Sequence, residues 1–361
     1  MLNTLNKKQK PCVGFEEKVE QGLQGAFAEI YYTLKDTAEQ KPQLIYNLQK
    51  NAKEFWDLTL ARKENFAIAT SGGKDSMSLA ITMQRLGANI ECIVINHNLR
   101  AESATEALKT HQILKSYGIK VTILNWIHKE IKTGIEERAR KERYKLLTQF
   151  CKNKQIRYLL TGHHLNDQTE TVLINLARGS GIDGLSGIKA LSTNNKINII
   201  RPMLNITREE VNVFIEENSI PYITDPSNQD IKITRNMLRI CLLKITNNQN
   251  QLDRRIAKVA TFMQEESKLI SVYINNLTRR FEKQNQHYII PATEYCKLQT
   301  ASRKRLIIQC VANISNAKTK PLEKSVNILI SQIESLQKGK KTLMSATIVW
   351  NDNSVELCKT N

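Results

Sequence analysis

The sequence predicts an α/β fold in which helices cover both faces of a parallel sheet, followed by a mainly helical domain that ends in a small β hairpin. Short apolar runs alternate with amphipathic helical segments up to about residue 224, and this alternation implies crossover connections between parallel strands. Residues 235–285 and 302–338 then have helical patterns, with a break near Pro321. In the tail, β-branched residues alternate on either side of Asn351-Asp352-Asn353, which indicates the hairpin.

The elements of the first domain follow from apolar spacing. Helical patterns precede the sheet at 15–38 and 43–62, and the expected domains are therefore an N-terminal extension at 1–40, an α/β domain at 41–230 and a basic helical domain at 231–361. Gly87 and Gly118 are stop signals for two of the helices. The expected strands are 66–69, 90–95, 120–124, 157–161 and 197–200, and the helices between them are 77–86, 103–117, 135–152 and a segment that reaches Arg178.

Composition favours a soluble protein of the reducing cytoplasm. No apolar run among the 361 residues is long enough to cross a bilayer, so no membrane partner is expected. The basic start is not followed by an apolar segment, which argues against a secretory signal. The seven cysteines are scattered and contain no C-x-x-C pair, which is typical of free thiols and argues against zinc and dithiol sites.

The net charge of +18 predicts a polyanionic partner. The charge is uneven, because +10 of it falls within residues 241–361. Lysine and arginine bind phosphates with release of counterions, so nucleic acid is the expected partner. The alternative is a solubilising surface in a chain that is rich in lysine.

The segment Ser71-Gly72-Gly73-Lys74-Asp75-Ser76 lies between the first strand and its helix. Small residues there leave the loop amides and the first free amides of the helix open to a phosphate. The spacing is neither that of a Walker loop nor that of a dinucleotide-binding fold. Considered alone, the segment is equally compatible with a serine-capped turn.

Polar clusters also follow the other strands. Asn96 to Arg100 come after the second strand, Gly162 to Thr171 after the fourth, and Arg201-Pro202 after the fifth. Ligands of parallel sheets bind beyond the carboxyl ends of the strands. This coincidence favours the phosphate cradle over the capped turn.

Acidic side chains follow the fourth strand. Asp167 and Glu170 are three residues apart and share one face of a helix start. A magnesium ion between these carboxylates and a phosphate would explain the pair, while the alternative is capping of the helix dipole. His163 and His164 are adjacent at a strand end and point in opposite directions, so they are not expected to bind one metal together. Four glycines within 179–187 indicate a closing lid or a plain linker.

Two basic clusters lie on predicted helices. Arg140, Arg143 and Tyr144 share a face at i, i+3 and i+4, and Arg235 and Arg239 recur in the same way at the start of the second domain. Such faces bind phosphate or stack on bases, although a solvated charged face is the common alternative.

Together the motifs go beyond a fold class. The S-G-G-x-D-S segment resembles the pyrophosphate loop of the N-type ATP pyrophosphatases, which have an adenine nucleotide α-hydrolase-like fold. Within that superfamily, residues 62–240 resemble the tRNA(Ile)-lysidine synthase family in motif order and spacing. The family often has two acidic residues where this chain has Asn166-Asp167, so only Asp167 takes the acidic role. The segments that carry this resemblance are Asn96–Arg100, Ala139–Tyr144, His163–Thr171, Arg178–Gly181, Arg201–Leu204, Asp225–Asn228 and Arg235-Asn236.

The resemblance implies an ATP-dependent carbon–nitrogen ligase that uses Mg²⁺. Its reaction adenylates the C2 oxygen of the wobble cytidine in the CAU anticodon of isoleucine tRNA. The ε-amine of free L-lysine then attacks C2, giving lysidine, AMP and pyrophosphate. A tRNA thiolase of the same superfamily is the runner-up, although it would depend on paired cysteines that this chain lacks, and a non-catalytic RNA-binding protein is a further alternative.

The resemblance also implies roles for single residues. Asp75, Asp167 and Glu170 are the expected catalytic residues, and Asp75 with Asp167 would hold Mg²⁺. Ser71, Gly72, Gly73, Lys74, Asp75 and Ser76 would bind ATP. The residues expected to contact tRNA or substrate are His97, Arg100, Arg140, Arg143, His163, Arg178, Arg201 and Arg235.

Overall fold

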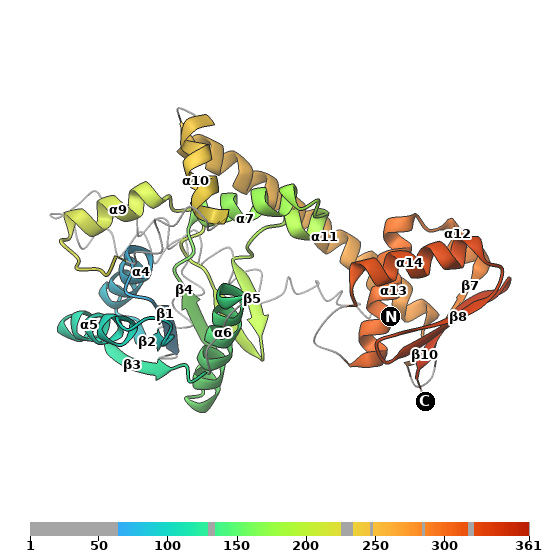
Figure 1. Ribbon diagram of the computed structural model, residues 1–361, viewed down its shortest axis with the longest axis horizontal. Coiled ribbons are helices and arrows are strands. Elements are labelled where there is room, and N and C mark those ends of the chain that lie inside the picture. The colour runs from blue at the N-terminus through green and yellow to red at the C-terminus, as the bar shows by residue number, and fades with distance from the viewer. Residues whose placement is uncertain are drawn as a thin grey trace, which may run out of the picture. The chain divides into compact units, whose positions relative to one another are not determined.

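The computed structural model describes residues 64–128, 134–224, 234–245, 248–283, 286–316 and 321–360. The chain forms two compact units, Met1–Met263 and Gln264–Asn361 (Figure 1). The helices expected at 15–38 and 43–62 and the Asp225–Asn228 segment lie outside the described residues. The expected boundary between an α/β domain that ends at residue 230 and a basic helical domain that begins at residue 231 stays a prediction.

The first unit contains a six-stranded sheet in the order β3-β2-β1-β4-β6-β5. The five expected strands are confirmed and run parallel, and their bounds are β1 Asn65–Thr70, β2 Asn89–Asn96, β3 Lys120–Asn125, β4 Tyr158–Thr161 and β6 Ile197–Ile200. The edge strand β5 (Leu191–Asn194) was not predicted and pairs antiparallel with β6. Asn195 and Lys196 join the two strands with φ of 51° and 68°, as a tight type I′ hairpin requires.

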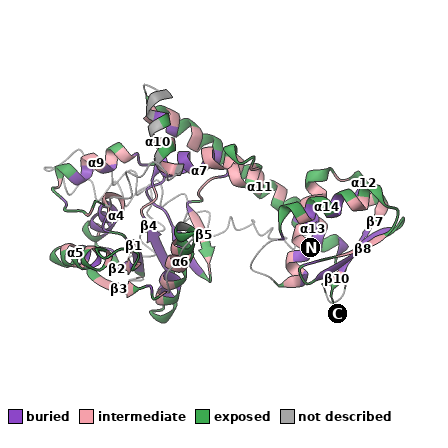
Figure 2. Cartoon of the chain, viewed as in Figure 1, coloured by how far each residue is buried: buried purple, intermediate pink, exposed green. Residues whose placement is uncertain are grey.

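Helices cover both faces of this sheet. Apolar side chains alternate along the strands, so that Phe66 and Ile68 pack on the side of α4 and α9, and Ala67 packs on the side of α6. Figure 2 shows buried positions along the strands. The helices of this unit are α4 Lys74–Arg85, α5 Ser103–Ser116, α6 Ile135–Asn153, α7 Leu165–Ala177, α8 Ile182–Leu185, α9 Arg208–Glu217 and α10 Thr234–Ile245, and α11 Gln249–Phe281 continues into the second unit.

The second unit packs helices on a four-stranded antiparallel sheet of order β7-β10-β9-β8. The hairpin expected in the tail is β9 and β10, and it lies inside this sheet. Tyr288, Ile348 and Leu357 from the sheet meet Leu306 and Leu329 from the helices in one buried cluster. The elements are β7 Tyr288–Pro291, α12 Ala292–Lys297, α13 Thr300–Ser315, α14 Glu323–Ser335, β8 Gly339–Leu343, β9 Ala346–Trp350 and β10 Ser354–Lys359.

None of the helices in the described part of the chain combines the length and the apolar composition that a bilayer crossing requires.

Candidate active site

The phosphate loop, residues 71–76, is shaped by hydrogen bonds among its own residues. The Ser76 hydroxyl accepts from the Ser71 amide at 3.1 Å and donates to the Gly73 carbonyl at 3.1 Å. One bond comes from far along the chain, because the Ile223 amide donates to the Gly72 carbonyl at 2.8 Å. The loop therefore holds its curve without a ligand, and its end is the first turn of α4.

Two glycines allow the close packing around this loop. Gly72 has φ of +86°, and a Cβ there would lie 2.3 Å from the Thr110 hydroxyl oxygen. Gly162 follows β4, and a Cβ at that position would lie 2.9 Å from the Asp75 carbonyl oxygen. The segment between β4 and α7 is thereby brought against the start of α4.

A cavity of about 530 Å³ opens at the carboxyl ends of β1, β2 and β4. Its size is that of a small-molecule site, and its wall combines apolar and polar side chains. Ile95, Leu99, Ile135, Ala139 and Leu147 contribute to the apolar wall. Among the residues predicted from the sequence, the lining contains Ser71, Asp75, Ser76, His97, Arg100, Arg143 and His163.

The buried polar atoms of this lining without a hydrogen-bond partner among the described residues include His97 Nδ1 and Arg143 Nε. Burial, with Arg143 and His128, lowers the pKa of His97 to about 4, so its imidazole is neutral at pH 7. Buried polar groups are usually paired, so these two atoms fit a cavity that takes a polar ligand.

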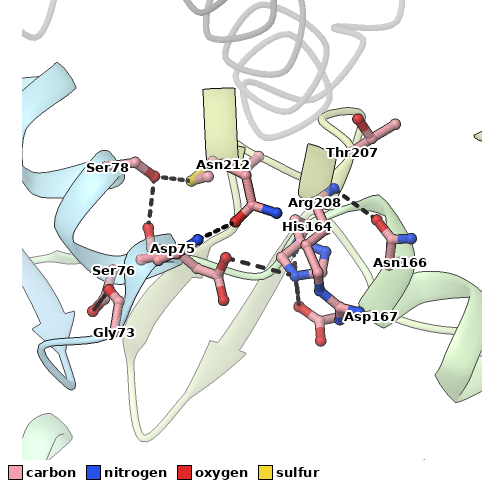
Figure 3. A network of polar contacts seen from close by, with 12 residues as sticks. Gly73, Asp75, Ser76, Ser78, His164, Asn166, Asp167, Thr207, Arg208 and Asn212 are labelled. Atoms are coloured by element: carbon pink, nitrogen blue, oxygen red, sulfur yellow. Dashed lines mark hydrogen bonds and ion pairs between the residues drawn. The ribbon is translucent and has the colours of Figure 1, made fainter. Parts of the chain in front are cut away.

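Asp75 and Asp167 face one imidazole from opposite helices. His164 Nε2 lies 3.7 Å from Asp75 Oδ1 and 3.7 Å from Asp167 Oδ2 (Figure 3). Asp167 Oδ2 also accepts from the His164 amide at 3.0 Å, and it therefore caps α7 as well as facing the site. The sequence offered capping of α7 and metal binding as alternatives for Asp167, but the capping bond to the His164 amide is compatible with both.

The two carboxyls have different protonation behaviour. Burial acts to raise the pKa of Asp167, but His164, His163 and the amide bond outweigh it and hold that pKa below its usual value. The pKa of Asp75 is raised, because burial and the Asp167 carboxylate together outweigh His164 and the arginines. Opposed shifts in neighbouring carboxyls are common at functional sites.

The carboxylate pair also fits the predicted magnesium ion. Within the described ranges, no three His, Cys, Asp or Glu side chains are arranged to hold a metal by themselves. Mg²⁺ usually needs only one or two carboxylates and takes its other ligands from substrate phosphates and water. Asp75 belongs to the loop of residues 71–76, as such an arrangement requires.

Glu170 occupies a different environment from Asp167. Its side chain is 1% exposed and is paired with Arg208 at 3.1 Å and with Arg239 of α10. Arg235 of the same helix donates to the Thr171 hydroxyl at 3.3 Å. The second turn of α7 is thus joined to α9 and α10 through arginine side chains, and the Glu170 carboxylate is already occupied by two guanidinium groups.

Asp253 was not singled out from the sequence. It lies in α11 with 0% exposure, and its Oδ2 accepts from Asn166 Nδ2 at 2.7 Å. Asn166 Oδ1 in turn accepts from the Arg208 amide at 2.8 Å. The only sequence signal for Asp253 was an acidic residue in a basic helix, and its partner is 87 positions away.

The remaining predicted residues lie at varying distances from the cavity. The Lys74 ammonium donates to Asn212 Oδ1 of α9 at 2.9 Å and lies over the Tyr222 ring, so it is turned away from the loop. Arg201 is buried and donates to the Lys189 carbonyl at 2.7 Å, which supports the edge of the sheet. Arg140 and Arg178 are exposed.

His163 and His164 have separate partners, as expected for adjacent residues at a strand end. His163 Nδ1 lies 2.8 Å from the Thr161 hydroxyl, whereas His164 faces the two aspartates. Burial, together with Arg201, Arg143 and Arg140, lowers the pKa of His163 to about 3 despite the opposing charge of Asp167. His163 is therefore a neutral group in the cavity wall at pH 7.

Comparison with known proteins agrees with this geometry. Residues 41–246 match the family model of the PP-loop domain. The tRNA(Ile)-lysidine synthase of Wolbachia pipientis wMel is 36% identical over 307 residues, which cover 82% of this chain and 68% of the Wolbachia protein. The chain belongs to the tRNA(Ile)-lysidine synthase family. The family member of Zymomonas mobilis is 30% identical over 78% of this chain and 84% of its own length.

Coverage of other family members is lower. The chain spans 64% of the protein from the Wolbachia of Brugia malayi and 51% of that from Orientia tsutsugamushi. Among solved structures, the U34-tRNA thiolase NcsA of Methanococcus maripaludis superposes with a TM-score of 0.52 at 17% identity, over 73% of this chain and 89% of the thiolase. At that identity the similarity shows a common fold.

Proposed function

We propose that this chain joins L-lysine to C2 of the wobble cytidine in the CAU anticodon of isoleucine tRNA, with ATP as co-substrate and in the cytoplasm. The observation that carries the proposal is the placing of Asp75 and Asp167 around His164 beside a phosphate loop. The family membership and the basic region 241–361 support it. No cysteine is among the residues that line the cavity, so nothing there favours a thiolase.

In this proposal ATP binds with its phosphates on the loop and its base in the apolar part of the cavity. The amides of residues 71–76 and the start of α4 hold the pyrophosphate portion. We assign this contact to the amides, because the Lys74 ammonium bonds to Asn212. His97 and Arg143 offer unpartnered polar atoms to the nucleotide.

The first step makes C2 of the base electrophilic. The C2 carbonyl oxygen attacks the α-phosphorus of ATP, a new oxygen–phosphorus bond forms, and pyrophosphate leaves. Asp75 and Asp167 would hold Mg²⁺, which neutralises phosphate charge when bound. The target base has to leave its stack to reach the cavity, and an anticodon loop makes that inexpensive.

The second step forms the carbon–nitrogen bond. The ε-nitrogen of lysine attacks C2, the C2–oxygen bond breaks, and AMP departs with that oxygen. The amine must lose a proton to attack. Asp167 suits binding of the lysine ammonium better than Glu170, whose two oxygens are paired with arginines. The lowered pKa of Asp167 makes it a weak acceptor of that proton. Arg140, Arg178, Arg235 and the basic second unit would position the tRNA.

The test is a reconstituted reaction. The protein is incubated with ATP, labelled lysine and a CAU-anticodon isoleucine tRNA transcript, and lysine in the tRNA and AMP are both measured. Equal amounts of incorporated lysine and AMP are expected, with none from a transcript that carries a GAU anticodon. Tight binding of the CAU transcript without any lysine incorporation would overturn the proposal.

A further inference from the structure

Asp253 is a buried carboxylate outside the segment that matches the PP-loop domain. That match ends at residue 246, and Asp253 lies in α11 with 0% exposure. We infer that Asp253 is a positioning residue for the reaction centre, because its bond to Asn166 fixes the first turn of α7. The inference rests on the proposed function only where its test measures lysine incorporation.

The orientation of the Asn166 amide is determined by its two partners. The Arg208 backbone N–H can only donate, so Asn166 Oδ1 faces it at 2.8 Å. Asn166 Nδ2 must then point at Asp253 Oδ2, which is 2.7 Å away and accepts. An acceptor is required at position 253, and both members of the pair are buried.

This bond lies directly beside the reacting groups. Asp167 follows Asn166 in the chain, and its carboxylate is 3.7 Å from the imidazole that also faces Asp75 (Figure 3). Catalysis depends on such spacings, and a displacement of about 1 Å costs about 100-fold. Release of Asn166 would therefore change how Asp167 faces the lysine amine.

Stability alone does not explain the arrangement. Burial raises the pKa of Asp253, although a hydrogen bond with Thr169 lowers it, so the carboxylate form is disfavoured at this place. A buried carboxylate costs folding free energy, and an apolar side chain here would avoid that cost. A need to hold the Asn166 amide in place accounts for a carboxylate at position 253.

The test uses a polarity swap. Asp253→Ala should lower kcat by about 10- to 100-fold while KM for tRNA changes by less than about twofold. Asn166→Asp places two carboxylates against each other and should be impaired as strongly. In the double variant Asn166→Asp/Asp253→Asn, the new amide donates to the new carboxylate, whose second oxygen still accepts from the Arg208 amide. This swap should recover most of the lost rate.

The matched control is Asn250→Ala. Asn250 also joins α11 to α9, through a 2.7 Å bond to Glu209, but that bond is exposed. Its loss should leave kcat unchanged. A double variant no faster than Asn166→Asp would overturn the inference, and so would equal losses in Asp253→Ala and Asn250→Ala.

A second readout does not depend on activity. Amide hydrogen exchange in residues 165–171 should speed up in Asp253→Ala, return toward the wild-type rate in the swap and stay unchanged in Asn250→Ala. If the wild-type protein incorporates no lysine, the proposed function fails and exchange alone decides the inference. If Asp253→Ala does not fold, the swap against Asn166→Asp decides it, and unchanged exchange in Asn166→Asp overturns it.

Discussion

The phosphate loop and the first turn of α7 are two walls of one site, and they are held in different ways. In the loop, the serine side chains bond within the loop itself, as Ser76 does to Ser71 and Gly73. Side chains in the first two turns of α7 bond to partners 38 to 87 positions away, in α9, α10 and α11. The curve of the loop therefore depends mostly on bonds within its own sequence, with one backbone bond from Ile223, whereas the start of α7 adds long-range side-chain bonds to its local cap.

The largest effect is expected where the two walls meet. Asp75→Ala removes the carboxylate that faces the shared imidazole, and lysine incorporation should fall by at least about 100-fold. Binding of tRNA should change by less than about twofold, since Asp75 is proposed to act on the phosphates of ATP and not on the tRNA. Filter binding and turnover measure the two quantities, with Asp352→Ala in the second unit as the control. If tRNA binding fell as much as turnover did, the role assigned to Asp75 would be wrong.

The α7 wall should be the more sensitive to loss of a buried charge. Glu170→Gln leaves Arg208 and Arg239 without their carboxylate and should lower the free energy of unfolding by about 3 kcal/mol. Glu142→Gln is the comparison, because it breaks a surface pair with Lys145 and should cost less than about 1 kcal/mol. Urea denaturation of both variants gives the difference. Equal values would mean that long-range contacts add no stability to this wall.

The loop wall should be sensitive to backbone conformation at one glycine. Gly72→Ala must hold a left-handed φ of +86° and meets the Thr110 hydroxyl, so about 1–3 kcal/mol of stability should be lost and KM for ATP should rise. At Gly73 φ is −72° and a Cβ has ordinary contact with Ser71. Gly73→Ala should therefore stay close to wild type in thermal melts. Similar losses in both variants would show that bulk alone, rather than conformation, limits the loop.

A smaller, pH-dependent effect is expected at His163, between the two walls. Its pKa is about 3 in the folded chain and about 6.5 when unfolded, so the unfolded state binds the additional proton between these values. The contribution of neutral His163 to the free energy of unfolding is thus fully present above pH 6.5. It falls as the pH drops toward 3, by up to about 1.4 kcal/mol per pH unit. Unfolding of wild type and His163→Asn at pH 7, 6 and 5 should show a shallower dependence in the variant. An unchanged slope would mean that His163 is protonated in the folded state.

The smallest effect is expected at Lys74. Its ammonium bonds to Asn212 instead of the loop, and such a contact contributes less than about 1 kcal/mol. Lys74→Met should therefore change KM for ATP by less than about fivefold. A larger rise, measured by steady-state kinetics with saturating tRNA, would show that the ammonium reaches the phosphates.

The same contrast explains what could be predicted from the sequence. The five parallel strands and the loop after β1 follow from local periodicity and small residues, and the structure confirms the strands. The edge strand β5 lacks an apolar run, because one of its sides has no neighbouring strand, and it escaped detection. Asp253 and the direction of Lys74 depend on residues that packing alone brings together, and no local pattern contains that information.

The bond between Asn166 and Asp253 also has a consequence for synthesis of the chain. A ribosome that adds about 5–20 residues per second takes roughly 4 to 17 s to make the 87 residues between them. At the start of that interval β1 to β4 and the residues of the loop have been made, whereas β5, β6 and Ile223, which bonds to the loop, are made during it. The Asn166 amide therefore waits for its partner in α11 until most of the first unit has been made.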